Sequence, residues 1–330
     1  MMQKLSWQQE LQQAITSTAE LLEILAIDPK ACPNLLAQPQ QFPLLVPRSF
    51  VARMQKNNLN DPLLRQVLPV TEEEKIVAGF GQDPLEENKL IRIPGLLHKY
   101  HGRVLITLSD ACAINCRFCF RRYFLYQKPN LALAEILSYL ANDKKIYEVI
   151  LSGGEPLLLN DQKLKSLFVQ LAALKHIKYL RIHSRLPIVM PSRITDEFIK
   201  CFTSTRLQSI MVMHCNHPNE IDSNVANAMQ RLKQANITLL NQSVLLKDIN
   251  DSASTLIELN NKLFNLGALP YYLHLLDKVQ GAAHFKVTKK TARLLIKELL
   301  RKLPGYLVPK LVVEQANTAH KIPLAHFNIS

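Results

Sequence analysis

The chain of 330 residues has no apolar run that approaches the ~18 residues a membrane-spanning helix requires. Its N-terminus also lacks the order of basic, apolar and small residues that marks a secretory signal. No long basic run occurs, and aromatic residues are not interleaved with the basic ones. These absences disfavour membrane insertion and nucleic-acid binding, and they predict a soluble cytoplasmic protein.

Cysteine is scarce, with six residues in the chain. Three of them form a CxxxCxxC pattern at Cys112, Cys116 and Cys119, and no fourth cysteine lies close by. Three thiolates on a four-iron cluster would leave one iron open to bind and reduce another molecule. A structural zinc site usually shows paired cysteines or cysteine with histidine, and buried cysteines can simply pack. The position directly after a strand-like run favours the cluster. The other cysteines have no partner spacing and are expected to pack: Cys32, Cys201 and Cys215.

Apolar residues make up 48% of the chain, enough for a sizeable core, and the formal net charge of +13 would help to draw in anionic groups such as phosphates. Apolar residues recur at helical spacing over Trp7–Ile27. The capping-box pattern Thr71–Glu74 predicts another helix start, and Gly79–Lys99 has the composition of an extended, loop-rich lead-in. We therefore expect an N-terminal helical and lead-in region over residues 1–100 and a second unit over residues 101–330.

Strand-like and helical patterns alternate in the second unit. The strand-like runs are Arg103–Leu108, Glu148–Leu151, Tyr179–His183, Ser209–His214, Thr238–Leu245 and Pro270–Leu275. The helical patterns are Ala132–Ala141, Gln162–Lys175, Thr195–Phe202, Asn224–Gln234, Ala253–Leu266 and Lys289–Leu303. This alternation predicts an α/β fold with a parallel sheet and right-handed crossovers, in the form of a partial (βα)6 TIM-like barrel. Functional residues should lie at the C-terminal ends of its strands.

Polar motifs do follow these strands. Gly153 and Gly154 could form only a tight turn, because glycine permits unusual backbone conformations. Beside a cluster, however, a glycine pair followed by Glu155 suits close approach of the backbone to a ligand. Arg185, at the end of the third strand, could hold a phosphate as a fork donor, with a structural salt bridge as the alternative.

The three-cysteine pattern resembles that of the radical S-adenosylmethionine (SAM) enzymes. The resemblance implies that the methionyl group of SAM chelates the open iron of a [4Fe-4S] cluster. It also implies that Gly153, Gly154 and Glu155 approach the methionyl ammonium. One electron from a reducing donor would then cleave SAM to the 5'-deoxyadenosyl radical.

Six motifs in order resemble the lysine 2,3-aminomutase family of this superfamily, and the resemblance runs from about residue 60 to the end of the chain. The motifs are CxxxCRFCFRR at 112–122, LSGGEPLLL at 151–159, RIHSRLPIVMPSRIT at 181–195, HCNHPNEI at 214–221, NQSVLLKDIND at 241–251, and PYYLHLLD with GAAHF at 270–285. The short bacterial members that act in the modification of elongation factor P are the most similar, as His183-Ser184-Arg185 and Pro304–Lys310 indicate.

The family also uses pyridoxal 5'-phosphate (PLP), so the resemblance implies a lysine that binds PLP as a Schiff base. Family members place this lysine seven residues after an acidic residue that ends a Val-Val-Asp strand, and Glu314 and Lys321 have that spacing. The glycines of the family's turn are missing here. Lys321 is therefore the expected PLP lysine, Lys310 is the competing candidate, and Arg185 is expected to hold the PLP phosphate.

The resemblance implies that Arg121 binds the substrate carboxylate and that Asp277 with Glu314 holds the distal ammonium. Two acidic groups facing a cation would reject an anionic side chain, because an unpaired buried charge costs on the order of several kcal/mol. Glu314 stands where the family has aspartate. The alternative is that both carboxylates are ordinary surface charges. Residues expected to line the adenosine or pyridoxal site are Asn216, His217 and Gln242.

The activity that follows is conversion of L-lysine to β-lysine, with the R form expected. The adenosyl radical would take hydrogen from the β-carbon of lysine held on PLP, and the amino group would migrate to that carbon. The product would serve β-lysylation of elongation factor P through a downstream ligase. The alternatives are a catabolic lysine aminomutase, action on a lysine already in a protein, and a non-catalytic iron–sulfur protein that docks a partner.

Overall fold

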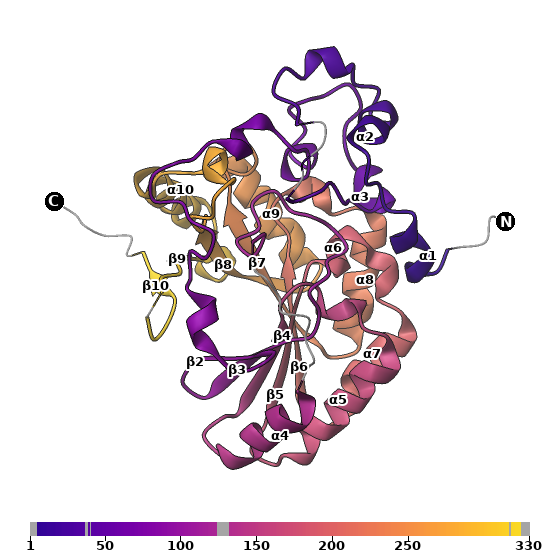
Figure 1. The fold of residues 1–330 in the computed structure, drawn as a ribbon, viewed down its shortest axis with the longest axis vertical. Helices are drawn as coiled ribbons and strands as arrows, with labels where there is room; N and C mark the ends of the chain where they lie inside the picture. Colours follow the sequence, from indigo (N-terminus) through magenta and orange to yellow (C-terminus); the bar gives the residue numbers. More distant parts are fainter. Residues whose placement is uncertain (1–4, 37–38, 40, 124–131, 317, 325–330) are drawn as a thin grey trace.

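A computed structural model describes residues 5–36, 39, 41–123, 132–316 and 318–324. This part of the chain contains one sheet of ten strands, and neighbouring strands follow chain order from β1 to β10 (Figure 1). The strands are β1 (Ile91–Ile93), β2 (Leu96–Tyr100), β3 (Arg103–Thr107), β4 (Glu148–Ser152), β5 (Tyr179–Ser184), β6 (Gln208–His214), β7 (Thr238–Leu245), β8 (Ala268–Leu275), β9 (Lys310–Val313) and β10 (Ile322–Pro323).

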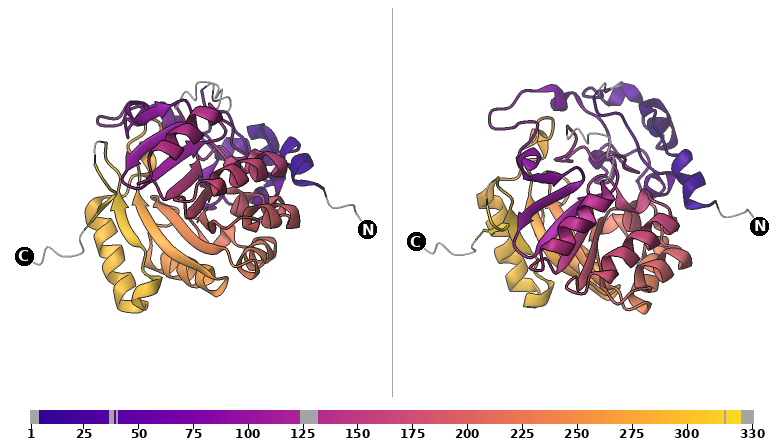
Figure 2. Two further views of the ribbon diagram at one scale, coloured as in Figure 1. Left: turned by 90° about the horizontal axis from the view of Figure 1, so that it is seen from below. Right: turned by 60° about the horizontal axis from the view of Figure 1, so that its bottom comes forward.

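All strands from β3 to β9 run parallel. At the two edges, β1 pairs with β2, β2 with β3, and β9 with β10 in antiparallel fashion. The sheet is open, since its first and last strands are not paired with each other. Figure 2 shows it curving so that its first strands and its last strands approach each other on one side. The prediction of a partial, open barrel is therefore confirmed, and β9 adds one parallel strand beyond the six strand-like runs.

Helices connect the parallel strands and cover the outer face of the sheet, as right-handed crossovers require (Figure 1). They are α4 (Leu133–Asn142), α5 (Asp161–Ala173), α6 (Leu186–Val189), α7 (Asp196–Thr203), α8 (Ser223–Gln234), α9 (Ala253–Asn265) and α10 (Lys289–Lys302). The six helices predicted in this region are all present, with ends within two residues of the expected ones. Among the described residues, no helix is long and apolar enough to cross a membrane.

The N-terminal helical pattern divides into two short helices, so a continuous helix over Trp7–Ile27 is the wrong reading. Helix α1 covers Trp7–Gln12 and α2 covers Thr18–Ile24. Between them the backbone of Ile15 exchanges two hydrogen bonds with Val46, of 2.8 and 3.0 Å. A helix cannot make this pairing, because its own carbonyl groups would occupy the same amide. A third short helix, α3, follows at Arg48–Val51.

The pattern at Thr71–Glu74 forms a single 3-10 turn in place of the predicted helix. Glu73, rather than Glu74, accepts a hydrogen bond from the backbone of Val70 at 3.3 Å. The lead-in region supplies β1 and β2, so the sheet begins at Ile91. The division of the chain near residue 100 stays a prediction.

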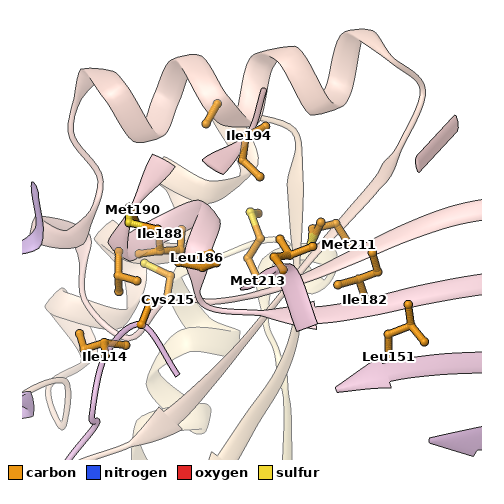
Figure 3. Close-up of a cluster of buried hydrophobic side chains, with 14 of the residues drawn as sticks. Ile114, Leu151, Ile182, Leu186, Ile188, Met190, Ile194, Met211, Met213 and Cys215 are labelled. Atoms are coloured by element: carbon orange, nitrogen blue, oxygen red, sulfur yellow. The ribbon is translucent and has the colours of Figure 1, made fainter. Parts of the chain in front are cut away.

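The two faces of the parallel sheet differ in character. Side chains on the outer face are apolar and fully buried against the helices, as Leu151, Ile182 and Met211 illustrate. Figure 3 shows this cluster, with Ile114 of the cysteine loop at one end of it. The inner face carries polar side chains, among them an ion pair of 3.0 Å between Arg181 and Glu148. Because both faces of a parallel sheet are normally apolar, a polar interior indicates a binding site.

We expect Leu151→Ala to lower the free energy of unfolding by about 2–5 kcal/mol, because truncation of a buried leucine leaves a cavity. Leu151 is 0% exposed. The matched control is Leu294→Ala on α10, where the side chain is 55% exposed, and its effect should stay within about 0.5 kcal/mol. Urea denaturation measures both. Equal losses in the two variants would contradict the placement of the core.

Candidate active site

The C-terminal ends of the parallel strands open on a cavity of about 300 Å³. All predicted site residues except Lys321, Glu314 and His217 line it. These residues are Cys112, Cys116, Cys119, Arg121, Gly153, Gly154, Glu155, Arg185 and Asp277. Asn216 and Gln242 also line the cavity, whereas the His217 side chain caps the turn that follows it by accepting from the Asn219 amide at 3.1 Å.

The glycine pair after β4 holds the cysteine loop in place. The amide of Gly154 donates to the Ser109 carbonyl at 2.9 Å, and the amide of Glu155 donates to the Ala111 carbonyl at 2.8 Å. A Cβ atom at Gly154 would lie 2.5 Å from the Ala111 oxygen. Gly153 has a φ of +108°, and a Cβ there would lie 2.9 Å from Thr107. Both positions therefore require glycine, independently of any ligand.

The Glu155 carboxyl group joins the ends of two strands. It accepts hydrogen bonds from the Ser184 hydroxyl at 2.8 Å, the Leu157 amide at 3.0 Å and the Arg185 amide at 3.1 Å. Burial raises the pKa of Glu155 to about 7, against the effect of these donors. Its carboxyl group thus has a positioning role in the fold, and its predicted contact with SAM stays a prediction.

A buried ion-pair cluster anchors the second half of the cysteine loop. Glu73 accepts from the Arg117 Nε at 2.8 Å and from the Arg122 Nη2 at 2.7 Å. The Arg117 side chain is fully buried. Removing one partner from such a cluster typically costs about 3–5 kcal/mol, because the remaining charge is left uncompensated. Glu73 was not recognised from the sequence, where it reads only as part of an acidic turn.

The three cysteines form no disulfide, and all of them line the cavity. Burial raises the pKa of Cys119 to about 11 and that of Cys112 well above its usual value, and a bound metal would reverse this because it binds the thiolate. Among the described residues, no three His, Cys, Asp or Glu side chains gather as a single metal ion requires. A four-iron cluster spreads its thiolates over different irons, so three thiols that line one cavity fit it.

Arg185 lies at the cysteine loop. Its Nη1 is 2.6 Å from the Cys116 sulfur, and its Nη2 is 2.6 Å from the Gln66 Oε1 and 3.4 Å from the Glu220 Oε2. Both terminal nitrogens of the guanidinium therefore already have partners in the cysteine loop and its surroundings. None of these contacts supports the predicted role as the PLP phosphate ligand.

The Lys321 ammonium contacts the Glu314 carboxylate and lies 5.9 Å from the centre of the Tyr272 ring. Glu314 also accepts from the Lys99 Nζ at 3.1 Å and the Tyr100 hydroxyl at 2.7 Å. Burial opposes ionisation of Glu314, but Lys321 and Lys99 outweigh it and hold the Glu314 pKa well below its usual value. Lys310, in contrast, is exposed at the start of β9. This difference favours Lys321 over Lys310 as the cofactor lysine.

Arg121 and Asp277 face the cavity near one another. Arg121 makes a bidentate contact with Glu87, with two bonds of 2.7 Å, and its Nη1 donates to the Gly153 carbonyl at 3.3 Å. Burial and the nearby Glu314 carboxylate raise the pKa of Asp277 to about 7, and Lys321 and Arg121 act in the opposite direction. Glu87 was missed because nothing in the lead-in sequence marks it as a partner of Arg121.

Several buried polar atoms in the barrel interior have no hydrogen-bond partner among the described residues. They are the His183 Nε2, the His274 Nε2, the Arg181 Nε and the Gln242 Oε1. Such an atom costs about 1–3 kcal/mol when it stays unpaired, so this lining fits a polar bound molecule. Burial lowers the pKa of His214 to about 3 and those of His183 and His274 well below the usual value. The histidines are therefore neutral.

Comparison with known proteins defines the class first. Residues 106–259 match the model of the radical SAM superfamily, so the cavity belongs to an enzyme with a [4Fe-4S] cluster and SAM.

Curated relatives give the family. The chain is 50% identical over 326 residues to the L-lysine 2,3-aminomutase of Escherichia coli (strain K12), covering 96% of this chain and 94% of that protein. Identity to the Haemophilus influenzae protein of the same name is 46%, covering 96% and 94%. The Clostridium subterminale protein of that name is 31% identical, with 96% and 77% covered. The chain belongs to the lysine 2,3-aminomutase family and is an isomerase.

We expect Gly154→Ala to lower the iron content of the reconstituted protein several-fold, because the added Cβ would push the loop that carries Cys112 away from β4. Overpacking of this kind typically costs about 1–3 kcal/mol. Gly305→Ala is the matched control, since a Cβ at Gly305 meets nothing within 4 Å. Iron and sulfide analysis measures both. Normal cluster content in Gly154→Ala would contradict the tight fit.

Proposed function

We propose that the chain converts L-lysine to β-lysine, using a [4Fe-4S] cluster, SAM and PLP. The observation that carries the proposal is the placement of Asp277. It lines the cavity that holds the three cysteines, and it lies within electrostatic reach of Arg121, Glu314 and Lys321. Charged groups suited to a lysine zwitterion with a charged tail therefore adjoin the cluster ligands.

The charged side chains form two sets, one for each charged end of the lysine substrate. Arg121 is the cation for the substrate carboxylate. The substrate would share the Arg121 guanidinium with Glu87 or displace the Glu87 carboxylate from it. Glu314 already balances Lys321 and Lys99, so Asp277 is the better-placed carboxylate for the distal ammonium. Its negative charge, together with Glu314, would repel an acidic side chain.

The cofactors carry the difficult chemistry: SAM on the reduced cluster supplies a radical that removes hydrogen, and PLP lets the amino group migrate. The cysteines would hold the cluster, and Lys321 would hold PLP. Two further cations lie near Lys321. Lys99 contacts Glu314, which also binds Lys321. The Arg103 guanidinium lies 4.9 Å from the centre of the Tyr100 ring. These two cations are our candidates for the PLP phosphate. A site for this chemistry must exclude water from the radical.

Free lysine fits this site better than a lysine residue of a protein. A lysine residue within a protein chain has no α-carboxylate, whereas Arg121 is a largely buried fork donor suited to one. A peptide-bound lysine would offer it only an amide.

We also propose that the product, as the R form, serves the modification of elongation factor P. The support is the likeness of His183-Ser184-Arg185 and Pro304–Lys310 to that branch of the family. Catabolic use of β-lysine is the alternative.

The test of the activity is an anaerobic reaction with dithionite, SAM, PLP and L-lysine, followed by chiral chromatography and mass spectrometry. We expect β-lysine from the wild type and none above background from Lys321→Ala. Lys310→Ala is the matched control and should retain wild-type activity, because this lysine is exposed.

Other outcomes would redirect the proposal. Formation of 5'-deoxyadenosine without β-lysine would support cleavage of SAM by the cluster and contradict lysine as the substrate. Activity only on elongation factor P would exclude free lysine as substrate. Full function of the Lys321→Ala variant would favour a non-catalytic role.

Binding of lysine should depend on pH through Asp277. The pKa of Asp277 is raised to about 7, so the carboxyl group loses its charge as the pH falls through that value. The KM for lysine should therefore rise by up to roughly tenfold between about pH 8 and pH 6, while the lysine ammonium stays charged. The Asp277→Asn variant should have a high KM for lysine at both pH values, and its KM should change much less with pH. An Asp277→Asn variant that keeps the wild-type pH profile would assign the titration to another group.

A further inference from the structure

We propose that Arg185 is a positioning residue for the iron–sulfur cluster: it donates a hydrogen bond to the Cys116 thiolate and thereby raises the reduction potential of the cluster. The contact that carries this inference is the 2.6 Å distance between the Arg185 Nη1 and the Cys116 sulfur. The proposal rests on the family's cluster and is independent of which substrate the enzyme uses.

The surroundings of Arg185 leave it little freedom to turn elsewhere. The residue is 6% exposed, and its guanidinium carbon lies 5.5 Å from the centre of the Phe50 ring and 5.4 Å from that of Phe118. Its backbone amide is bound to the Glu155 carboxyl group at 3.1 Å. The backbone and the guanidinium of Arg185 are thus both held in place, and one guanidinium nitrogen contacts the Cys116 sulfur.

A buried polar network fixes the other nitrogen. The Arg185 Nη2 donates to the Gln66 Oε1 at 2.6 Å, and the Gln66 amide donates to the Glu220 Oε1 at 3.0 Å. Asn216 donates to the same Gln66 oxygen at 3.0 Å. Gln66 and Glu220 are both 0% exposed. The network therefore orients the guanidinium from behind, and Glu220 supplies the charge that balances it.

This arrangement has a direct electrostatic consequence. Reduction adds one negative charge to the cluster, and a buried cation next to a ligand sulfur favours the more negative state. Hydrogen bonds to the sulfurs shift cluster potentials in the same way. Glu220, whose carboxylate lies 3.4 Å from the Arg185 Nη2, acts in the opposite direction because its charge is negative. Arg185 and Glu220 should thus have effects of opposite sign on one measured quantity.

The experiment is a redox titration of the reconstituted [4Fe-4S] protein without SAM, followed by electron paramagnetic resonance. We expect Arg185→Met to lower the ratio of reduced to oxidised cluster at the wild-type midpoint at least tenfold, which is a shift of about 59 mV for a one-electron couple. Arg185→Lys, which keeps the charge without the fork, should shift the midpoint less. Glu220→Gln should move it in the positive direction.

The matched control is Arg193→Met. Arg193 is also fully buried, and its guanidinium carbon lies 4.7 Å from the Trp7 ring and 4.9 Å from the Phe198 ring, but its partners are the carbonyls of Leu157 and Leu159 and the Asp161 carboxylate. It should lose stability and keep the wild-type midpoint. Iron content and circular dichroism establish that each variant is folded and loaded.

Two results would overturn the proposal. The first is an unchanged midpoint in Arg185→Met. The second is a shift of the same size in Arg193→Met. If the first result comes with loss of PLP binding, Arg185 is instead a ligand of the PLP phosphate. Because the titration needs neither SAM nor lysine, its outcome is separate from that of the β-lysine assay.

Discussion

The parallel hydrogen-bond ladder from β3 to β9 is the constraint on which the rest of the structure depends. Since all of these strands run the same way, the loops that follow them must emerge at one edge of the sheet. The cysteine loop, the glycine pair, Arg185 and Asp277 come from four different strand ends and meet there. The curvature of the open sheet then brings the first strands near the last, so that Lys99 of β2 donates to Glu314, which follows β9, at 3.1 Å.

The cysteine loop shows how a segment with little regular structure can be fixed by contacts of different physical kinds. Backbone hydrogen bonds attach its start to Gly154, where the absence of a side chain permits the approach. A buried carboxylate, Glu73, binds the two arginines of its second half. In the middle, Arg185 reaches the Cys116 sulfur. Each contact comes from a separate part of the chain, so three different segments hold the loop.

The barrel was predictable because its strands are buried runs and its helices have clear apolar periodicity. The site motifs were predictable because they follow strand ends. The features that the sequence did not predict depend on contacts between residues far apart in the chain. Ile15 interrupts a helical pattern by pairing with Val46, and Glu87 and Glu73 act on arginines that lie 34 and 44 residues away. For Arg185 the sequence identifies no single partner, because a guanidinium fork suits a phosphate as well as a thiolate; the fold adds its contact with the Cys116 sulfur, and the phosphate role stays a prediction.

The contacts of Glu314 carry a consequence for the order in which the molecule forms. Glu314 binds Tyr100 and Lys99, which precede it by 214 and 215 residues. A ribosome makes the N-terminal part first, so the cysteine loop and most of the sheet exist before the segment with Glu314 and Lys321 has emerged. The contacts of Glu314 with Lys99 and Tyr100 can form only after that segment has emerged. The three cysteines are thus synthesised well before the carboxylate and the lysine that lie near the far edge of the sheet.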